Sequence, residues 1–291
     1  METIGLIGLG NIGSAIAPRL AADATVVGHD IDPAAHAALA DLGGHPVDNV
    51  RDVGVQAGLV ITALPSPTAL HAVVAELLEV DIDGLVVAET STLRLEDKEA
   101  ARQTLARAGA TLLDCPLSGT AMQARQGDVV VYASGDADGL AQAQPAFDSF
   151  ARRTYHLGAF GQGMRMKLVA NLLVAIHNVA TAEALVLAGK AGLDPATVVD
   201  VVSDGAGTSR MFEVRGPMMV DGRYRQPGMN VGVFQKDVAI ITDFARELGV
   251  PTPLLAASTA VYSAAQAHGW SGSDTASVYA ILAELANVEH P

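Results

Sequence analysis

The sequence predicts an α/β protein in which a doubly wound parallel sheet is followed by an all-α domain. Short apolar runs alternate with helix-like segments in the first half, a glycine-rich turn follows the first run, and no strand-like run follows the region of Gly158. With 291 residues, of which 50% are hydrophobic, the chain can build two cores. Strands that alternate with helices are typical of a parallel sheet covered on both faces.

Apolar runs in the first half are predicted to be strands. They are Thr3–Ile7, Thr25–Gly28, Leu59–Ala63, Leu85–Ala88, Thr111–Leu113, Val129–Ala133 and Thr154–His156. The segments between the early runs have helical periodicity. They are Ile12–Ala22, Ala34–Asp41, Thr68–Leu78 and Glu96–Ala108.

The second half is predicted to be helical. The segment from Met166 to Lys190 is long, apolar nearly all round and free of proline, so its helix must be buried on most sides. Asp194 and Pro195 are typical of a helix cap followed by the first helical residue. Further helical stretches are predicted at Gln235–Leu248, Pro253–His268 and Asp274–Val288. A glycine cluster near residue 160 marks the junction, which predicts domains at 1–160 and 161–291.

Charge and cysteine content exclude several classes of protein. The formal net charge is −14, whereas binding to nucleic acid or to an anionic membrane surface requires a basic footprint. A single cysteine, Cys115, excludes an internal disulfide framework and a cysteine-based zinc site, and the histidines form no spaced metal motif. No secretory leader and no uncharged apolar run of about 18 residues is found. We therefore expect a cytoplasmic protein with no metal, no nucleic-acid partner and no membrane span.

The turn Gly8-Leu9-Gly10-Asn11-Ile12-Gly13 matches the pattern G-x-G-x-x-G. It follows a predicted strand and opens a predicted helix, which is the context that dinucleotide binding requires. Gly8 would form the tight turn, Gly10 would let the backbone approach a pyrophosphate, and Gly13 would pack helix against strand. The helix N–H groups would then face the phosphates. The first domain is therefore predicted to be a Rossmann-type domain that binds its cofactor through residues 8–13.

Asp30 at the end of the second predicted strand indicates which dinucleotide is bound. An acidic side chain there accepts hydrogen bonds from the ribose hydroxyls and repels a 2′-phosphate. The next residue is Ile31, so no neighbouring cation is present to hold such a phosphate. NAD is therefore predicted as the cofactor, with NADP less favoured. Asp32, which precedes Pro33, is better explained as a helix cap.

Lys167 and Asn171 are the candidate catalytic residues. Their i, i+4 spacing places both side chains on one face of the long predicted helix. A helical lysine is usually a solvated surface residue, but the residues around Lys167 are largely apolar. A lysine in such surroundings, beside a glycine turn, could transfer a proton.

Four ordered motifs make the chain resemble the β-hydroxyacid dehydrogenase family, which includes 3-hydroxyisobutyrate dehydrogenases and tartronate semialdehyde reductases. The glycine turn is similar to the cofactor signature of the family, and Asp114–Thr120 is similar to its substrate loop, D-x-P-V-S-G-G. Gly161–Asn171 is similar to its catalytic G-x-G-x-x-x-K-x-x-N, and Lys236-Asp237 to its late K-D pair. The resemblance runs from the first strand to the last helix.

The resemblance implies a role for each residue of the catalytic and substrate motifs. Lys167 would be the general acid/base at the alcohol or carbonyl oxygen. Asn171 would hydrogen-bond the substrate and orient the lysine. Ser118, with the backbone at Gly119 and Thr120, would bind the carboxylate of the substrate.

The resemblance also implies further cofactor contacts. Leu64 and Pro65 would lie along the cofactor, Thr92 would sit near the nicotinamide, and Lys236 would approach from the helical domain. Simpler roles stay open for three of these residues. Pro65 would then only end a strand, Thr92 would only cap a helix, and Lys236 would only be a surface charge.

Two positions raise the question of which substrate is bound. Thr120 replaces the second glycine of the family's substrate loop, which would narrow the pocket or add a hydroxyl ligand. Arg210 follows a glycine turn in the helical domain and could pair with the carboxylate of a substrate. The alternative for Arg210 is a surface ion pair with Glu213.

Together these features predict an NAD-dependent oxidoreductase acting on a small 3-hydroxy acid such as 3-hydroxyisobutyrate, tartronate semialdehyde or a sugar acid. The partner is thus a small carboxylate-bearing substrate. Two alternatives are an imine reductase on the same scaffold and a cofactor-binding module without turnover. Lys167 argues against both, and Asp30 argues against the imine reductase, because the resemblance implies that imine reductases often replace this lysine and prefer NADP. The resemblance further implies a homodimer or homotetramer formed through the helical domain.

Overall fold

The computed structural model describes residues 3–225 and 228–290, and the chain divides into two compact units. The first unit is Met1–Lys167 and the second is Leu168–Pro291. The division falls inside one long helix, α8 (Gln162–Lys190), rather than in the glycine-rich connector that precedes it.

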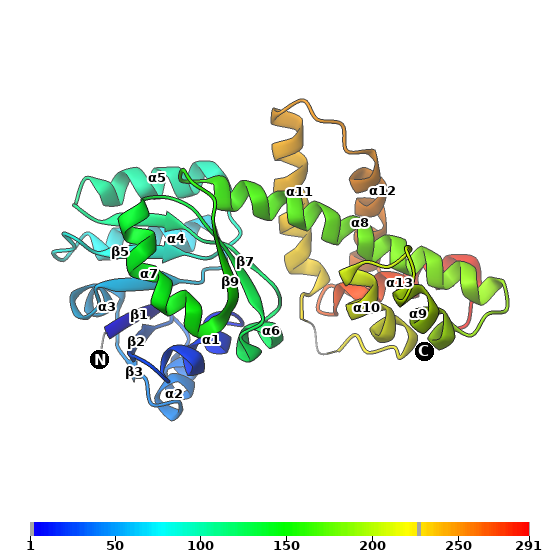
Figure 1. Ribbon diagram of the computed structural model, residues 1–291, viewed down its shortest axis with the longest axis horizontal. Coiled ribbons are helices and arrows are strands. Elements are labelled where there is room, and N and C mark those ends of the chain that lie inside the picture. The colour runs from blue at the N-terminus through cyan, green and yellow to red at the C-terminus, as the bar shows by residue number, and fades with distance from the viewer. Residues whose placement is uncertain (1–2, 226–227, 291) are drawn as a thin grey trace. The chain divides into compact units, whose positions relative to one another are not determined.

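Six parallel strands form the main sheet of the first unit (Figure 1). They are β1 (Thr3–Ile7), β2 (Thr25–His29), β3 (His45–Pro46), β4 (Leu59–Thr62), β5 (Val86–Glu89) and β6 (Thr111–Asp114). Their order is β3-β2-β1-β4-β5-β6, so the succession of strands reverses between β1 and β4. β4 and β5 consist mainly of aliphatic residues, and both strands are buried along their whole length. The predicted doubly wound sheet is confirmed.

Helices cover both faces of this sheet (Figure 1). Those on one face are α1 (Gly13–Leu20), α2 (Pro33–Asp41) and α7 (Ala137–Phe150). Those on the other face are α3 (Val50–Gln56), α4 (Pro67–Leu77) and α5 (Leu95–Ala106). The side chains of Asp32 and Ser66 cap α2 and α4, and each helix then starts with proline. The cap predicted at Asp32 is therefore confirmed.

A small three-stranded sheet completes the first unit. Its strands are β7 (Leu117–Ser118), β8 (Val129–Ala133) and β9 (Ala151–His156). β8 pairs antiparallel with β7 and parallel with β9, and the short helix α6 (Ala121–Gln126) connects β7 to β8. The last two predicted strands therefore belong to this sheet and do not extend the main one.

The second unit is helical in its described part, apart from one isolated bridge between Asn230 and Asp274. After α8 come α9 (Pro195–Ser203), α10 (Arg210–Val220), α11 (Val231–Glu247), α12 (Pro253–Ala267), a 3-10 turn (Thr275–Ser277) and α13 (Val278–Ala286). The helical domain expected from the sequence is confirmed.

Helix α8 is less buried than the sequence predicts, since Leu173 and Leu187 are 47% and 71% exposed. The expectation that it is buried on most sides is therefore wrong for this chain, because apolar residues also lie on its exposed face. By length and composition alone α8 could cross a membrane, since an 18-residue window has a mean hydropathy of 1.7. Core helices of water-soluble proteins pass the same test, and 44% of that window is buried inside the structure. The buried amide of Asn178 on α8 donates hydrogen bonds to the carbonyl of Thr275 at 2.7 Å and to the hydroxyl of Tyr262 at 3.1 Å. The amide nitrogen of Asn178 is thus paired with protein groups.

Candidate active site

The predicted site segments of the first unit all follow the carboxyl ends of strands in the main sheet. The glycine turn follows β1, Asp30 follows β2, Leu64-Pro65 follows β4, Thr92 follows β5 and the substrate loop follows β6. Because all six strands are parallel, these segments share one edge of the sheet. The turn after β1 also lies where the strand order reverses, and open α/β sheets bind ligands at that point.

The glycine turn has the form that a bound pyrophosphate needs. Gly8 has φ +88°, and a Cβ atom there would collide with the carbonyl oxygen of Ala63. A Cβ atom at Gly13 would collide with the carbonyl oxygen of Gly8. Around Gly10, by contrast, the space that a Cβ would enter is open, so a ligand can approach the backbone. Helix α1 starts without a side-chain cap, so its first N–H groups can face a phosphate. These residues fit a dinucleotide.

Asp30 is fixed beside the glycine turn. One of its carboxylate oxygens accepts the N–H of Leu9 at 2.6 Å, and the other accepts the N–H of Asp32 at 2.9 Å. The backbone N–H of Asp30 donates to Nε2 of His36 at 3.2 Å. The residue after Asp30 is Ile31, which carries no charge and is 95% exposed. Asn11 is exposed and Ile12 is half-buried at the turn itself.

The segments after β4 and β5 are joined to each other. The hydroxyl of Ser91 accepts the N–H of Leu64 at 2.7 Å, and the hydroxyl of Thr90 donates to the carbonyl of Thr62 at 2.7 Å. Pro65 is exposed and Thr92 is half-buried. Helix α5 has Arg94 at its N-cap, and the side chain of Arg94 does not cap the helix.

Thr120 in the substrate loop has a structural role. It caps α6 in a reciprocal arrangement: its hydroxyl accepts the N–H of Gln123 at 3.3 Å, and its own N–H donates to Oε1 of that glutamine at 3.0 Å. Its hydroxyl is therefore already used where a second glycine would leave α6 uncapped. Ser118, at the end of β7, and Gly119 are half-buried.

Lys167 and Asn171 lie one turn apart on α8, and both are buried, at 7% and 4% exposure. The amide nitrogen of Asn171 donates to Oδ2 of Asp237 at 3.0 Å, which fixes the orientation of the asparagine. The neighbouring Lys236 on α11 has a side chain that is 37% exposed, and its ammonium lies 3.8 Å from Oδ1 of Asp237. Within the second unit, the K-D pair is thus joined to α8 through Asn171.

Arg210 is the first residue of α10, with a side chain that is 67% exposed. Its guanidinium lies 3.2 Å from the carboxylate of Glu213. The structure therefore shows the surface ion pair that the sequence left open as one alternative for this arginine.

Known proteins match the chain over its whole length. Residues 3–158 match the family described as the NAD binding domain of 6-phosphogluconate dehydrogenase, and residues 161–282 match the NAD-binding family of NADP-dependent 3-hydroxyisobutyrate dehydrogenase. An L-threonate dehydrogenase of Cupriavidus necator is 33% identical over 97% of this chain and 96% of its own. The chain belongs to the β-hydroxyacid dehydrogenase family.

Other members of the β-hydroxyacid dehydrogenase family are similar to this one in sequence and in fold. The 2-hydroxy-3-oxopropionate reductase of Escherichia coli is 28% identical over 98% of both chains. The 3-hydroxyisobutyrate dehydrogenase of Mycobacterium tuberculosis, crystallised with L-serine, superimposes with a TM-score of 0.87 at 26% identity. It covers 97% of this chain and 99% of its own. Membership supports an NAD(P)-dependent oxidoreductase acting on CH–OH groups, and the glycine turn fits that cofactor.

A buried cluster of three charged side chains was not predicted from the sequence. Lys98 on α5 lies between Glu89 at the end of β5 and Asp114 at the end of β6, and all three side chains are at most 1% exposed. The sequence does contain a signal for it. Lys98 has the same helical spacing as Ala101 and Leu105, which places it on the buried face of α5. Next to Asp114, burial raises the pKa of the Cys115 thiol, which therefore stays protonated and is no nucleophile.

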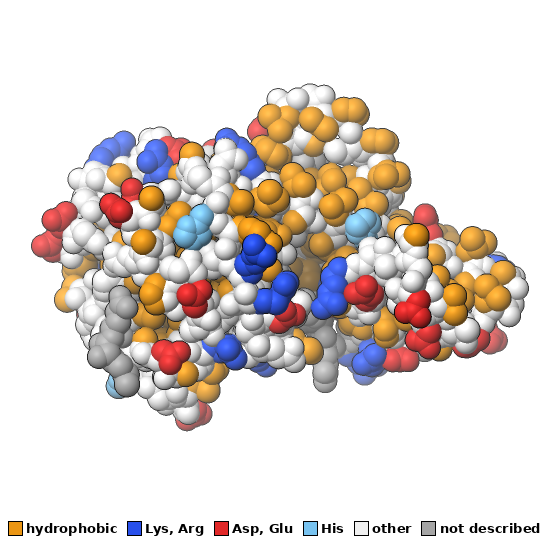
Figure 2. All heavy atoms as spheres, in the orientation of Figure 1, with side chains coloured by type: hydrophobic (Ala, Val, Ile, Leu, Met, Phe, Trp, Pro, Cys, Tyr) orange, Lys and Arg blue, Asp and Glu red, His pale blue; other side chains and the backbone are white. Residues whose placement is uncertain are grey.

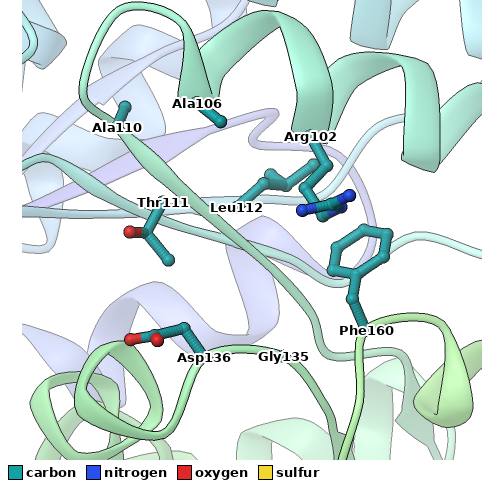
Figure 3. A pocket seen from close by; sticks show the side chains of 8 residues that line it. All are labelled: Arg102, Ala106, Ala110, Thr111, Leu112, Gly135, Asp136 and Phe160. Atoms are coloured by element: carbon teal, nitrogen blue, oxygen red, sulfur yellow. The ribbon is translucent and has the colours of Figure 1, made fainter.

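A separate cavity lies by the edge strand β6. It has a volume of about 350 Å³, and Figure 3 shows the side chains that line it. They are Arg102, Ala106, Ala110, Thr111, Leu112, Gly135, Asp136 and Phe160. Arg102 lies over the ring of Phe160 and is hydrogen-bonded to Glu99, whose pKa is lowered to about 2 by Arg102 and Gln103. The cavity contains none of the predicted site residues.

Within residues 3–225 and 228–290, no group of three His, Cys, Asp or Glu side chains is placed to hold a metal ion.

Proposed function

We propose that this protein is an NAD-dependent dehydrogenase of small 3-hydroxy acids in which Lys167 is the general acid/base. The observation that carries the proposal is the burial of Lys167 on an apolar stretch of α8, one turn before Asn171. An ammonium that faced water would be an ordinary surface charge, whereas a buried lysine suits proton transfer.

Each residue then has a chemical task. In oxidation, the amine of Lys167 accepts the proton of the substrate hydroxyl. Asn171, which Asp237 orients, hydrogen-bonds the substrate and directs the lysine. The hydroxyl of Ser118 and the backbone N–H of Gly119 bind the substrate carboxylate. The N–H of Thr120, which was also predicted to take part, already donates to Gln123. Bound NAD supplies the hydride acceptor, and the protein supplies orientation and electrostatics.

The names of the relatives support this class of substrate. L-threonate, 2-hydroxy-3-oxopropionate and 2-(hydroxymethyl)glutarate are small acids with a hydroxyl or oxo group within two carbons of a carboxylate. We propose a substrate of the same kind. A cytoplasmic location goes with it, because nicotinamide nucleotides are held inside cells.

A panel of substrates tests the proposal. The absorbance of reduced nicotinamide is followed in both directions. Oxidation of L-threonate and of 3-hydroxyisobutyrate is measured with NAD and with NADP, and reduction of tartronate semialdehyde and of a cyclic imine is measured with NADH and with NADPH. We expect turnover of at least one hydroxy acid with NAD. Reduction of the imine alone would favour the imine reductase, and cofactor binding without any turnover would favour a binding module.

We further propose a homodimer or homotetramer formed through the second unit. Figure 2 shows apolar side chains gathered over α11 and α12. The large exposed apolar residues of these helices and of the turn between them are Val233, Leu248, Val250 and Leu254. Apolar patches of this kind mark protein–protein contacts.

Sedimentation at micromolar concentration is expected to show a dimer or tetramer, and Leu254→Glu is expected to shift the protein toward monomer. A wild-type protein that sediments only as a monomer under these conditions would refute the proposed association.

A further inference from the structure

A buried charge triad connects the segments of the first unit that carry the candidate site. The ammonium of Lys98 lies 2.7 Å from Oδ1 of Asp114, as a hydrogen bond, and 2.7 Å from Oε2 of Glu89. Burial alone lowers the pKa of Lys98, but the charges of Asp114 and Glu89 outweigh burial and raise it, so the ammonium stays charged. Three charges so far from water are costly unless each is paired, and two carboxylates here share one cation.

One arm of the triad holds the start of α8. Oδ2 of Asp114 accepts the N–H of Met164 at 2.7 Å and the hydroxyl of Ser134 at 3.2 Å. The same hydroxyl accepts the N–H of Gly163 at 2.9 Å. The first turn of α8 is thus attached to the residue that opens the substrate loop. Lys167 follows three residues after Met164, about one helical turn further on.

The other arm holds the segments after β4 and β5. Oε1 of Glu89 accepts the N–H of Ser91 at 2.9 Å. The hydroxyl of Ser91 in turn accepts the N–H of Leu64 at 2.7 Å. Leu64, with Pro65, is predicted to lie along the cofactor, and Thr92, which follows Ser91, is predicted to sit near the nicotinamide. Lys98 is therefore the point at which the cofactor segments, the substrate loop and the helix of Lys167 are joined.

We propose that Lys98 is a positioning residue of the active site. Its charge holds Glu89 and Asp114 together and so sets the placement of the first turn of α8 relative to the sheet. The inference rests on the proposed function where it names Lys167 as the group being positioned. The attachment of α8 itself can be measured without turnover.

Lys98 positions the two carboxylates through its charge and not through its bulk. Glu89 and Asp114 are directly opposite each other in the pairing of β5 with β6. Lys98→Met keeps a long side chain but leaves two carboxylates without a cation, and they repel each other. Adding Glu89→Gln removes one negative charge and provides an amide that can donate to Asp114. The double variant should therefore regain what the single variant loses.

The first measurement is turnover. Lys98→Met is expected to lower kcat about 100-fold, the loss that a displacement of about 1 Å produces. Lys98→Met/Glu89→Gln is expected to recover most of it. The Kd for ADP-ribose should change little in both variants, because the glycine turn and Asp30, which fit the phosphates and the adenosine ribose, make no contact with the triad. The pH profile of kcat should gain an ionisation in Lys98→Met, from the two carboxylates, and lose it in the double variant.

The second measurement is hydrogen exchange of backbone amides in the holoenzyme. Exchange at Gly163 and Met164 should rise about tenfold or more in Lys98→Met, because Asp114, which accepts the N–H of Met164, loses the cation that holds its carboxylate in place. Exchange in α1 should not change. Lys190→Met, at the exposed end of α8, is the control and should match wild type in both measurements. If Lys98→Met does not fold, Asp114→Asn tests the same arm, because it leaves Lys98 paired with Glu89.

The outcomes separate the inference from the proposed function. If Lys98→Met has the kcat and the amide exchange of wild type, the inference is overturned. It is also overturned if Lys98→Met has a low kcat that the added Glu89→Gln does not restore. Unchanged exchange at Met164 in Asp114→Asn would overturn it as well. If wild type oxidises no hydroxy acid, the proposed function fails, and hydrogen exchange still decides whether Lys98 positions α8.

Discussion

Lys167→Ala is expected to lower kcat by about 10²–10⁴-fold, the usual contribution of a positioned proton-transfer group. The lysine is 7% exposed on α8, so bulk water has little access to take over the proton. Binding of NAD should be kept, because the residues that fit the phosphates and the adenosine ribose, Gly8–Gly13 and Asp30, belong to other segments. The experiment compares kcat on the best hydroxy acid with the Kd for NADH.

Lys190→Ala is the matched control for this variant. It removes the last lysine of the same helix, which is exposed and donates to the carbonyl of Asn287. Its kcat should equal that of wild type. A Lys167→Ala enzyme with near-normal kcat and intact NADH binding would show that another group moves the proton.

Element length decided how much of the fold could be predicted from the sequence. The strands of the main sheet that have four or five residues, such as β1 and β4, were predicted to within one residue at each end. β3 and β7 have two residues each, which is too short for any periodicity to appear. Helix α7 was not predicted at all, and it contains Pro145, a residue that usually marks the end of a helix.

The candidate site divides in a similar way. The glycine turn, Asp30 and the Lys167–Asn171 pair lie in short local motifs, so their placement follows from the strand or helix that carries them. Lys98 could not be assigned, because its partners come from two different strands and are brought together only by packing. The cap at Thr120 was readable in principle, since threonine followed by glutamine three residues later resembles a capping box.

Wild-type enzyme is expected to prefer NAD over NADP by about 100-fold or more in kcat/KM. The carboxylate of Asp30 accepts the N–H of Leu9 at 2.6 Å, so its charge is held beside the glycine turn. An acidic side chain at the end of the second strand would repel the 2′-phosphate of NADP. Like charges placed together cost several kcal/mol, and every 1.4 kcal/mol is a factor of ten. The measurement is kcat/KM for both cofactors at one saturating substrate concentration. Equal or better turnover with NADP would contradict the role given to Asp30.

The same argument predicts how the preference can be reversed. Asp30→Asn keeps an oxygen that can accept the N–H of Leu9 but removes the charge, so discrimination against NADP should fall. Ile31 is 95% exposed, and Ile31→Arg would place a cation where a 2′-phosphate can pair with it. The double variant should therefore favour NADP. Asp32→Asn is the matched control, because Asp32 caps α2 with its side chain and asparagine caps equally well. If Asp32→Asn shifts the preference as much as Asp30→Asn, the discrimination comes from the overall negative charge of this turn and not from one carboxylate at the ribose.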